Sequence, residues 1–352
     1  MAYNTSMNDT NYAQLAKEAI RHATGIEPSA SPLLTSLGYH LTIHSQPRHE
    51  RLMRLGFEAT VAKLPFSIRY PITNLMKKIR NPKSTVPIAS MKDLFGYNLV
   101  RDLIKNDIPK FFYEGSKGVI VLTHDVDNLV GWNMLPEALK DLRSRHLPAT
   151  FNFLTRADYP LDYTVLDRLA TAGHEIGLHG STHDIALAFR SEASILQTLR
   201  RGRTALQERP SGFRSPAFSV SHALFKALDG AGFVYDSSIQ VASTFYHSTS
   251  FPFPYRLPGF DLIELPLTFN DDMVVRDAPL SDQGSLRVFS ELLDDTLAVG
   301  GVFVANIHPH NLVGRMGLYE SILELVQEKK SAGTRVTTAG QIVDIFGSRL
   351  AQ

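Results

Sequence analysis

The sequence predicts an α/β fold in which a mostly parallel sheet is closed or wound with outer helices. Two observations support this fold class. From residue 118 onward, short apolar runs alternate with helical patterns, which is typical of repeated β–α units. The run at 119–122 contains only apolar residues and leads directly into polar ones, as expected of a strand that is buried on both faces. Residues 31–112 lack this alternation and indicate short helices and loops.

The alternation places the elements along the chain and divides it in two. Residues 1–112 are expected to form a helical, basic region that packs on the barrel formed by residues 113–352. Gly173 is expected to end the helix before it, because glycine readily adopts the left-handed conformation of a C-cap. Strands are predicted at 119–127, 149–154, 175–179, 211–214, 233–236, 262–267, 302–308 and 335–338, and helices at 12–23, 162–172, 184–207, 221–231, 286–299 and 319–330.

The composition is that of a globular protein, with 43% hydrophobic and 20% charged residues. The net charge of +1 gives no global field that would attract nucleic acid, so no nucleic-acid partner is expected. Cysteine is absent, which excludes disulfides and thiolate metal sites and leaves His, Asp and Glu as the strong ligands. The N-terminal residues lack the basic and apolar regions of a signal peptide. We therefore expect a cytoplasmic protein.

The stretch 46–83 is strongly basic, with nine Lys and Arg residues against two Glu, an excess of +7. Apolar residues interleave with the basic ones, which gives two interpretations. The stretch would contact an anionic membrane at its inner face or a phosphate-bearing substrate. Alternatively, it is a solvated basic face that packs its apolar side on the barrel, which is the commoner case.

Two carboxylates, Asp125 and Asp127, follow the apolar run. If the strand extends to Asp127, its period of two directs both carboxylates to the same side. The carboxyl end of a parallel strand is where α/β folds carry their chemistry. The alternative interpretation is a helix N-cap followed by a surface acid.

The segment Gly173–His183 contains two histidines four residues apart, His179 and His183. They share a face if the chain turns helical after the strand, and two such imidazoles can bind one metal ion. Chance or core histidines are the alternative. With a carboxylate from a neighbouring strand, the pair becomes a His₂–carboxylate site that leaves positions open for water and substrate.

The ordered motifs from residue 118 to residue 346 resemble the polysaccharide deacetylase family of NodB-homology type, metal-dependent enzymes that remove N-acyl groups from amino sugars. Thr123–Asp127 resembles the family's strand ending in Thr-x-Asp-Asp, and Gly173–His183 is similar to Gly-His-Glu-Ile-x-x-His-x-x-x-His. The resemblance implies a distorted (β/α)7 TIM-like barrel with an N-terminal helical extension. Further matches are Arg214–Pro216, Tyr235–Ser238, Glu264–Pro266 and Phe303–His308.

The resemblance also implies roles for individual residues. Asp127, His179 and His183 would hold a divalent ion, zinc first, with Co²⁺, Ni²⁺ or Mn²⁺ as alternatives. Asp125 would accept the proton as metal-bound water attacks the acyl carbonyl. Arg214 would pair with Asp125 and keep it ionised; as a lone residue before Ser-Pro it would be a surface residue in a turn.

His308 would protonate the departing amine, because an amide anion is too basic to leave unaided. His310 is a second candidate acid, but it lies beyond Pro309, whereas His308 ends the strand as the family requires. Asp236 would orient or polarise a catalytic partner, or else cap a helix before two serines. Contacts to the substrate are expected from Trp132, as a sugar-stacking or a core residue, and from Pro216, Tyr235 and His310.

Two features depart from most of the family. Val126 separates the aspartates that are usually adjacent, an Asp-x-Asp variant that resembles peptidoglycan and formyl-sugar deacylases, so the assignment of base and ligand is open. No aromatic residue follows the fourth motif at Ser238, which leaves the acyl preference open.

The function expected is metal-dependent hydrolysis of an N-acyl group, N-acetyl first, on an amino sugar or a lipid-linked saccharide. Three alternatives are retained. The first is an N-formyl or cyclic-amide hydrolase of the same fold, and the second a catalytically silent saccharide-binding barrel. The third is a non-haem iron oxygenase with two His and one carboxylate. The third is least favoured, because its H-x-D pairing and jelly-roll strand pattern are missing.

Overall fold

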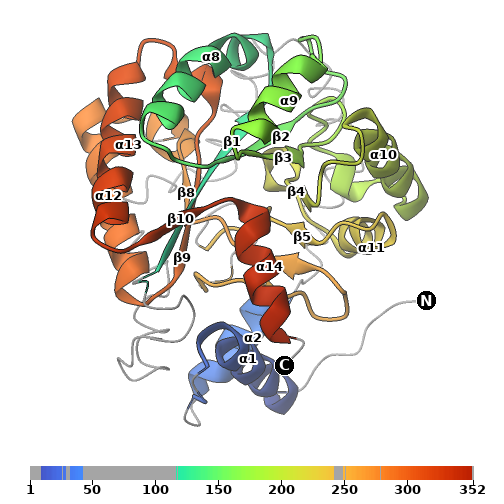
Figure 1. Ribbon diagram of the computed structural model, residues 1–352. Coiled ribbons are helices and arrows are strands. Elements are labelled where there is room, and N and C mark those ends of the chain that lie inside the picture. The colour runs from blue at the N-terminus through green and yellow to red at the C-terminus, as the bar shows by residue number, and fades with distance from the viewer. Residues whose placement is uncertain are drawn as a thin grey trace.

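The computed structural model describes residues 9–25, 27–28, 32–42, 116, 118–241, 249, 251–277 and 279–350 (Figure 1). The basic stretch 46–83 lies outside the described residues, and so does most of the expected boundary between the two regions. Within the described residues, no helix combines the length and the hydropathy required to cross a membrane.

The strands form one largely parallel sheet around which the helices are arranged (Figure 1). Its order is β6-β7-β5-β4-β3-β2-β1-β9-β8, β10 pairs with β1, and only the β6–β7 pair among these is antiparallel. The predicted fold class, a distorted (β/α)7 barrel with N-terminal helices, is confirmed. The strands are β1 Val119–Val126, β2 Thr150–Phe153, β3 Glu175–Leu178, β4 Gly212–Phe213, β5 Tyr235–Asp236, β6 Tyr255–Arg256, β7 Ile263–Glu264, β8 Phe269–Asn270, β9 Val302–Asn306 and β10 Arg335–Thr337.

The helices cover the outside of the sheet (Figure 1). Side chains cap the N-termini of several of them; the Asn128 Oδ1, for example, accepts a hydrogen bond from the N–H of Gly131 at the start of α8. Two helices of the barrel, α8 and α14, were not predicted, and α8 contains Pro136 in its interior. The helices are α1 Asp9–Thr24, α2 Pro32–Leu41, α8 Leu129–Ser144, α9 Tyr163–Thr171, α10 Glu192–Ala205, α11 His222–Gly230, α12 Asp282–Ala298, α13 Met316–Ser331 and α14 Ala339–Leu350.

The central strand β1 is completely buried within the sheet. All eight of its residues are buried, and β1 pairs with β2, β9 and β10 along its length. A parallel strand that is covered on both faces needs such an apolar sequence. The two N-terminal helices pack on one another, and α1 also contacts α14 and β6 of the barrel.

Glu175, the first residue of β3, forms hydrogen bonds at the amino-terminal end of the sheet. The catalytic residues expected from the sequence lie at the other end, where the strands finish. The Glu175 carboxylate accepts hydrogen bonds from the hydroxyls of Tyr235 (2.9 Å) and Thr150 (2.8 Å) and from the N–H of Gly340 at the start of α14 (2.7 Å). The expectation that Tyr235 contacts substrate is therefore wrong. The Tyr235 hydroxyl contacts Glu175, the first residue of β3, and so lies at the end of the sheet away from the candidate site.

Candidate metal and acid–base site

The polar side chains predicted to act together meet at the carboxyl ends of four parallel strands. β1 carries Asp125 and ends just before Asp127, while the loop after β3 carries the two histidines. β4 leads into Arg214, and β9 leads into His308. Strand register brings them together, since neighbouring parallel strands end at one edge of a sheet.

Asp127, His179 and His183 form a cluster of the size that a metal ion requires. Oδ1 of Asp127 lies 3.2 Å from Nε2 of His179 and 3.7 Å from Nε2 of His183. Burial opposes ionisation of Asp127, but the two imidazoles outweigh it and hold the pKa of this carboxyl well below 3.8. The three groups expected to act as ligands are thus adjacent.

The hydrogen bonding of His179 shows that these residues fit a bound cation. Nδ1 of His179 lies 2.8 Å from the carbonyl oxygen of Arg214, which can only accept, so Nδ1 carries the proton. In neutral His179, the lone pair of Nε2 then faces Oδ1 of Asp127, which is itself buried and without a hydrogen-bond donor. Two acceptors facing each other at this distance require a cation between them, either a proton or a metal ion.

The two histidines meet through a loop and not, as predicted, through a helical turn. Residues 179–186 are irregular, with Gly180 at φ +97° and His183 at φ +48°. These left-handed residues reverse the chain, and the imidazole rings lie with centroids 5.2 Å apart. The helix expected over 184–207 is correspondingly shorter and begins at Glu192, because Ser191 caps it.

Asp125 is buried and held by three donors. Oδ1 accepts hydrogen bonds from Nδ2 of Asn152 (2.8 Å) and from Nη1 of Arg214 (3.2 Å), and Oδ2 accepts one from Nδ2 of Asn306 (2.8 Å). Since each carboxylate oxygen accepts two hydrogen bonds, one acceptor position remains, on Oδ2. Burial raises the pKa of Asp125, but the charges of Arg214 and His179 lower it by more than burial raises it, which favours the ionised carboxylate.

Arg214 is not a surface residue of a turn, because only 1% of it is exposed. Besides Asp125, its guanidinium donates to Oγ1 of Thr123 (2.6 Å) and to the carbonyl (2.9 Å) and hydroxyl (2.8 Å) oxygens of Ser237. A buried cation requires this degree of pairing. Arg214 therefore holds Asp125 of β1 in place relative to β4, which precedes Arg214, and β5, which precedes Ser237.

The sequence analysis did not identify the residue that orients His308, which is Asp271. Nδ1 of His308 lies 2.6 Å from Oδ1 of Asp271, and Nε2 of His308 lies 3.7 Å from Oδ2 of Asp127. Burial favours the neutral imidazole, but the carboxylates of Asp271 and Asp272 outweigh it and raise the pKa of His308 well above 6.5. The two carboxylates therefore favour the protonated form of His308, which lies next to Asp127.

Asp236, to which the sequence analysis gave an orienting role or a helix cap, contacts different groups. Its carboxylate accepts hydrogen bonds from the N–H (3.0 Å) and hydroxyl (2.8 Å) of Ser238, and no helix starts there. It also shares a hydrogen bond with Glu264, whose burial and proximity to Asp236 raise its pKa well above 4.5. Oε2 of Glu264 is buried and receives no donor, which favours the protonated form of Glu264, with its proton donated to Asp236.

The remaining residues expected at the substrate lie in three different places. Pro216 starts a short helical turn, Pro216–Phe218, and is buried against Gly180 of the histidine loop. His310 lies in the turn Pro309–Leu312, with its ring 5.2 Å from that of His308. Trp132 is a packing residue of α8, as its indole stacks on Tyr159 with centroids 4.9 Å apart.

The fold and the site together define an α/β barrel with a candidate metal centre and acid–base groups at the carboxyl ends of its strands. Residues 113–235 match the family model described as polysaccharide deacetylase. Among curated proteins, the chain is similar to the peptidoglycan deacetylase of Helicobacter pylori (strain ATCC 700392 / 26695), with 29% identity over 108 residues. That match covers 30% of this chain and spans only 36% of the H. pylori protein.

Solved structures show the same fold. A putative polysaccharide deacetylase from Mycobacterium smegmatis superposes with a TM-score of 0.55 at 22% identity, covering 67% of this chain and 92% of the other. A probable polysaccharide deacetylase from Pseudomonas aeruginosa PAO1 gives a TM-score of 0.55 at 14% identity, covering 66% and 92%. Puue allantoinase gives a TM-score of 0.55 at 15% identity, covering 66% and 91%. The match of residues 113–235 to the polysaccharide deacetylase model confirms the resemblance that the motifs indicate.

Proposed function

We propose that this protein is a metal-dependent amide hydrolase that removes an N-acyl group, N-acetyl first, from an amino sugar. The observation that carries the proposal is the convergence of Asp127, His179 and His183 beside the carboxylate of Asp125 and the imidazole of His308. The family match supports the reaction class.

Asp127, His179 and His183 would hold the ion through one carboxylate oxygen and two Nε2 atoms. A divalent ion at such a site supplies Lewis acidity, which activates water and polarises a carbonyl oxygen. His179 is oriented for this by its Nδ1 contact with the carbonyl of Arg214.

Asp125 would act as the general base. Its one remaining acceptor position, on Oδ2, receives the proton of the attacking water, while Asn152, Asn306 and Arg214 keep the carboxylate in place. His308 would donate its Nε2 proton to the amine as the carbon–nitrogen bond breaks, and Asp271 stabilises the imidazolium. Water is consumed, and a carboxylic acid and an amine are the products.

Metal binding is tested first, by isothermal titration of the metal-free protein with Zn²⁺. We expect one ion per chain, and an affinity lowered at least about tenfold by Asp127→Asn. His146→Asn is the matched control, because His146 is exposed and lies at φ +50°, a conformation that Asn tolerates. A wild-type protein that binds no zinc would remove the proposal.

The substrate is tested by incubating the zinc-loaded protein with N-acetylated and N-formylated amino sugars and with allantoin, side by side. Release of acetate that is lost in Asp125→Asn supports the proposal. Faster release of formate, or ring opening of allantoin, assigns the related hydrolase activities instead. Zinc binding without any product indicates a barrel that binds saccharides but does not turn them over.

A further inference from the structure

A groove on the outer surface of the barrel separates α8 from α9, and the proposed function does not use it. Neighbouring helices elsewhere, such as α10 with α11 and α12 with α13, pack directly on each other. Between α8 and α9 a cavity of about 290 Å³ remains open. This volume is just below the range of drug-sized small-molecule sites, about 300–1,000 Å³, and suits a smaller ligand.

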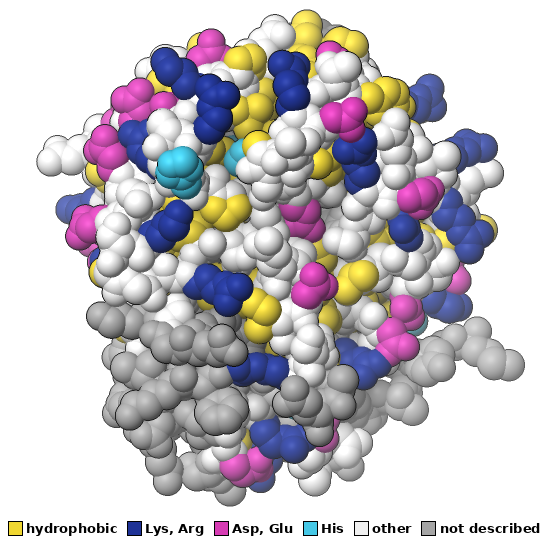
Figure 2. Space-filling model, in the orientation of Figure 1, with side chains coloured by type: hydrophobic (Ala, Val, Ile, Leu, Met, Phe, Trp, Pro, Cys, Tyr) yellow, Lys and Arg dark blue, Asp and Glu magenta, His cyan; other side chains and the backbone are white. Residues whose placement is uncertain are grey.

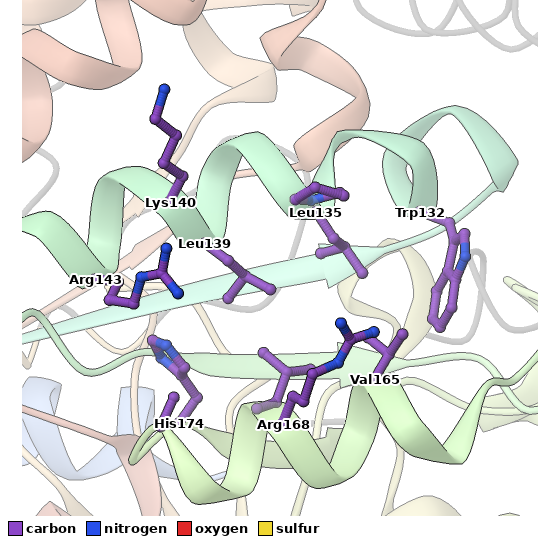
Figure 3. Close-up of a pocket in the computed structure, with 11 residues that line it drawn as sticks. Trp132, Leu135, Leu139, Lys140, Arg143, Val165, Arg168 and His174 are labelled. Atoms are coloured by element: carbon purple, nitrogen blue, oxygen red, sulfur yellow. The ribbon is translucent and has the colours of Figure 1, made fainter.

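The walls of the groove are apolar. Leu135 and Leu169 form its buried floor, and the sides are only partly covered (Figure 3). Hydrophobic side chains lie between Lys and Arg side chains over α8 and α9 on this face (Figure 2). A concave apolar surface flanked by charges is typical of a binding site. The partly covered walls come from Trp132, Leu139 and Val165.

His174 supplies a directed donor at one end of the groove. Its Nδ1 accepts a hydrogen bond of 3.2 Å from the backbone N–H of Ala149, so the proton of the neutral ring is on Nε2. Only 8% of His174 is exposed. No described residue accepts a hydrogen bond from Nε2, and the ring lies at the groove below Arg143 (Figure 3). The Nε2–H of His174 is therefore a donor that a ligand in the groove can reach.

Two guanidinium groups complete the donor set. Arg143 and Arg168 reach into the groove from α8 and α9 respectively, whereas Lys140 points away from it (Figure 3). Neither arginine forms an ion pair with a described carboxylate, and no Asp or Glu lines the groove. Nε of Arg168 donates to the carbonyl of Thr164 at 3.2 Å, which leaves the terminal nitrogens for a ligand. The charge of the groove is therefore complementary to an anion.

We propose that the α8–α9 groove binds a small amphipathic phosphate monoester. The phosphate accepts hydrogen bonds from Arg143 and from Nε2 of His174 at one end of the groove, the apolar body lies along Leu139, Leu135 and Trp132, and Arg168 adds positive charge beside it (Figure 3). Phosphate is favoured over carboxylate because its greater negative charge suits a groove with two guanidinium groups, and its three terminal oxygens can accept from Arg143 and His174 together. A soluble ester and the headgroup of a phosphomonoester lipid share this chemistry.

Binding is directly measurable because Trp132 is the only tryptophan of the chain. The protein is titrated with octyl phosphate, octanoate and 1-octanol below their aggregation concentrations, and the tryptophan fluorescence is followed. We expect a saturable change with octyl phosphate at a concentration at least about tenfold lower than with the other two. The absence of a saturable change, or equal affinity for octanoate or octanol, would overturn the proposal.

Variants test the donors. The double variant Arg143→Gln with Arg168→Gln is expected to weaken octyl phosphate binding at least about tenfold. Arg201→Gln on α10 is the matched control, since Arg201 is exposed and the part of the chain that the structure describes gives it no hydrogen bond or ion pair. Unchanged binding in the double variant contradicts the assignment.

Sedimentation with vesicles separates the two sources of the phosphate. If the ligand is a phosphomonoester lipid, the wild-type protein co-sediments with phosphatidylcholine vesicles that contain phosphatidic acid, and the double variant does not. If octyl phosphate binds but vesicles do not, the ligand is a soluble ester. Equal sedimentation of wild type and double variant, without octyl phosphate binding, would refute the groove as the site. None of these measurements depends on hydrolase activity.

Discussion

The side-chain amide of Asn306 donates a hydrogen bond of 2.8 Å to Oδ2 of Asp125. The same nitrogen lies 3.4 Å from Nε2 of His308, and Oδ1 of Asn306 accepts from Arg214 at 3.1 Å. One buried amide thus contacts the proposed base, the proposed acid and the cation that pairs with the base. Asn306 is a positioning residue, because it sets the separation of two groups that must act on the same substrate.

Asn306→Ala removes this link, and we expect kcat to fall about 10- to 100-fold with little change in KM. The reason is that Asp125 loses its only donor on Oδ2, while the proposed metal ligands keep their contacts. Steady-state kinetics, on the substrate that the hydrolysis assays identify, measure kcat and KM separately. Zinc titration checks that the metal still binds. Asn133→Ala on the exposed surface of α8 is the control. An unchanged kcat would contradict the positioning role.

Asp271→Asn tests the origin of the proton that His308 delivers. Asp271 and Asp272 together raise the pKa of His308 against the effect of burial, so replacing Asp271 by Asn lowers that pKa. The reaction needs protonated His308 and is lost as pH rises through the pKa. The descending limb of kcat/KM against pH should therefore move to lower pH. A limb that stays in place would mean that His308 is not the acid.

Glu264→Gln tests the buried carboxyl pair through stability. Burial raises the pKa of Asp236 from 3.8 to about 6 and raises that of Glu264 well above 4.5, so the folded chain binds more protons than the unfolded chain. The stability that the pair contributes is complete below about pH 4 and is lost as pH rises through the folded pKa values. The side-chain amide of Gln can donate a hydrogen bond to Asp236 but does not ionise. The variant therefore avoids the loss of stability that occurs in wild type when Glu264 ionises at higher pH.

The melting temperature of Glu264→Gln should therefore rise relative to wild type between pH 5 and pH 8, by about 2–4 °C for each 1 kcal/mol recovered. Thermal unfolding in a series of buffers measures the difference. Glu320→Gln on the exposed face of α13 should show no trend. A difference that is flat across this range would mean that Glu264 is ionised in the folded protein.

The sequence predicted the parts of the site that rest on strand periodicity. β1 is an apolar run that ends in polar residues, and parallel strands end at one edge, so Asp127 could be placed beside the histidines of a neighbouring strand without a structure. The place of His308 in the site came from the family resemblance. The path of the loop between His179 and His183 could not be predicted, because the left-handed conformation of His183 leaves no signal in the sequence.

Asn152, Asn306 and Asp271 were missed because their roles depend on register. Asn152 lies directly opposite Asp125 across β1 and β2, and Asn306 lies opposite Thr123 across β1 and β9. A polar residue within an apolar strand was the available signal, as in Phe151–Phe153. Which groups it meets follows only once the strands are aligned.

Gly177 of β3 offers a test of that alignment. A Cβ atom at this position would lie 2.1 Å from Oδ1 and 3.2 Å from Cγ of Asn152, its neighbour on β2. Gly177→Ala must therefore displace the Asn152 side chain, which breaks its hydrogen bond to Oδ1 of Asp125. We expect a loss of about tenfold in kcat with zinc binding retained.

Gly317→Ala on α13 is the matched control, because a Cβ atom there meets nothing within 4 Å and alanine favours a helix. If Asn152 acts on Asp125, Asn152→Ala should lower kcat by a similar factor, and the double variant Gly177→Ala with Asn152→Ala should be no slower than either single variant. Losses that multiply in the double variant would show that Gly177 affects the site by another route, such as a shift of β3 and the histidine loop that follows it.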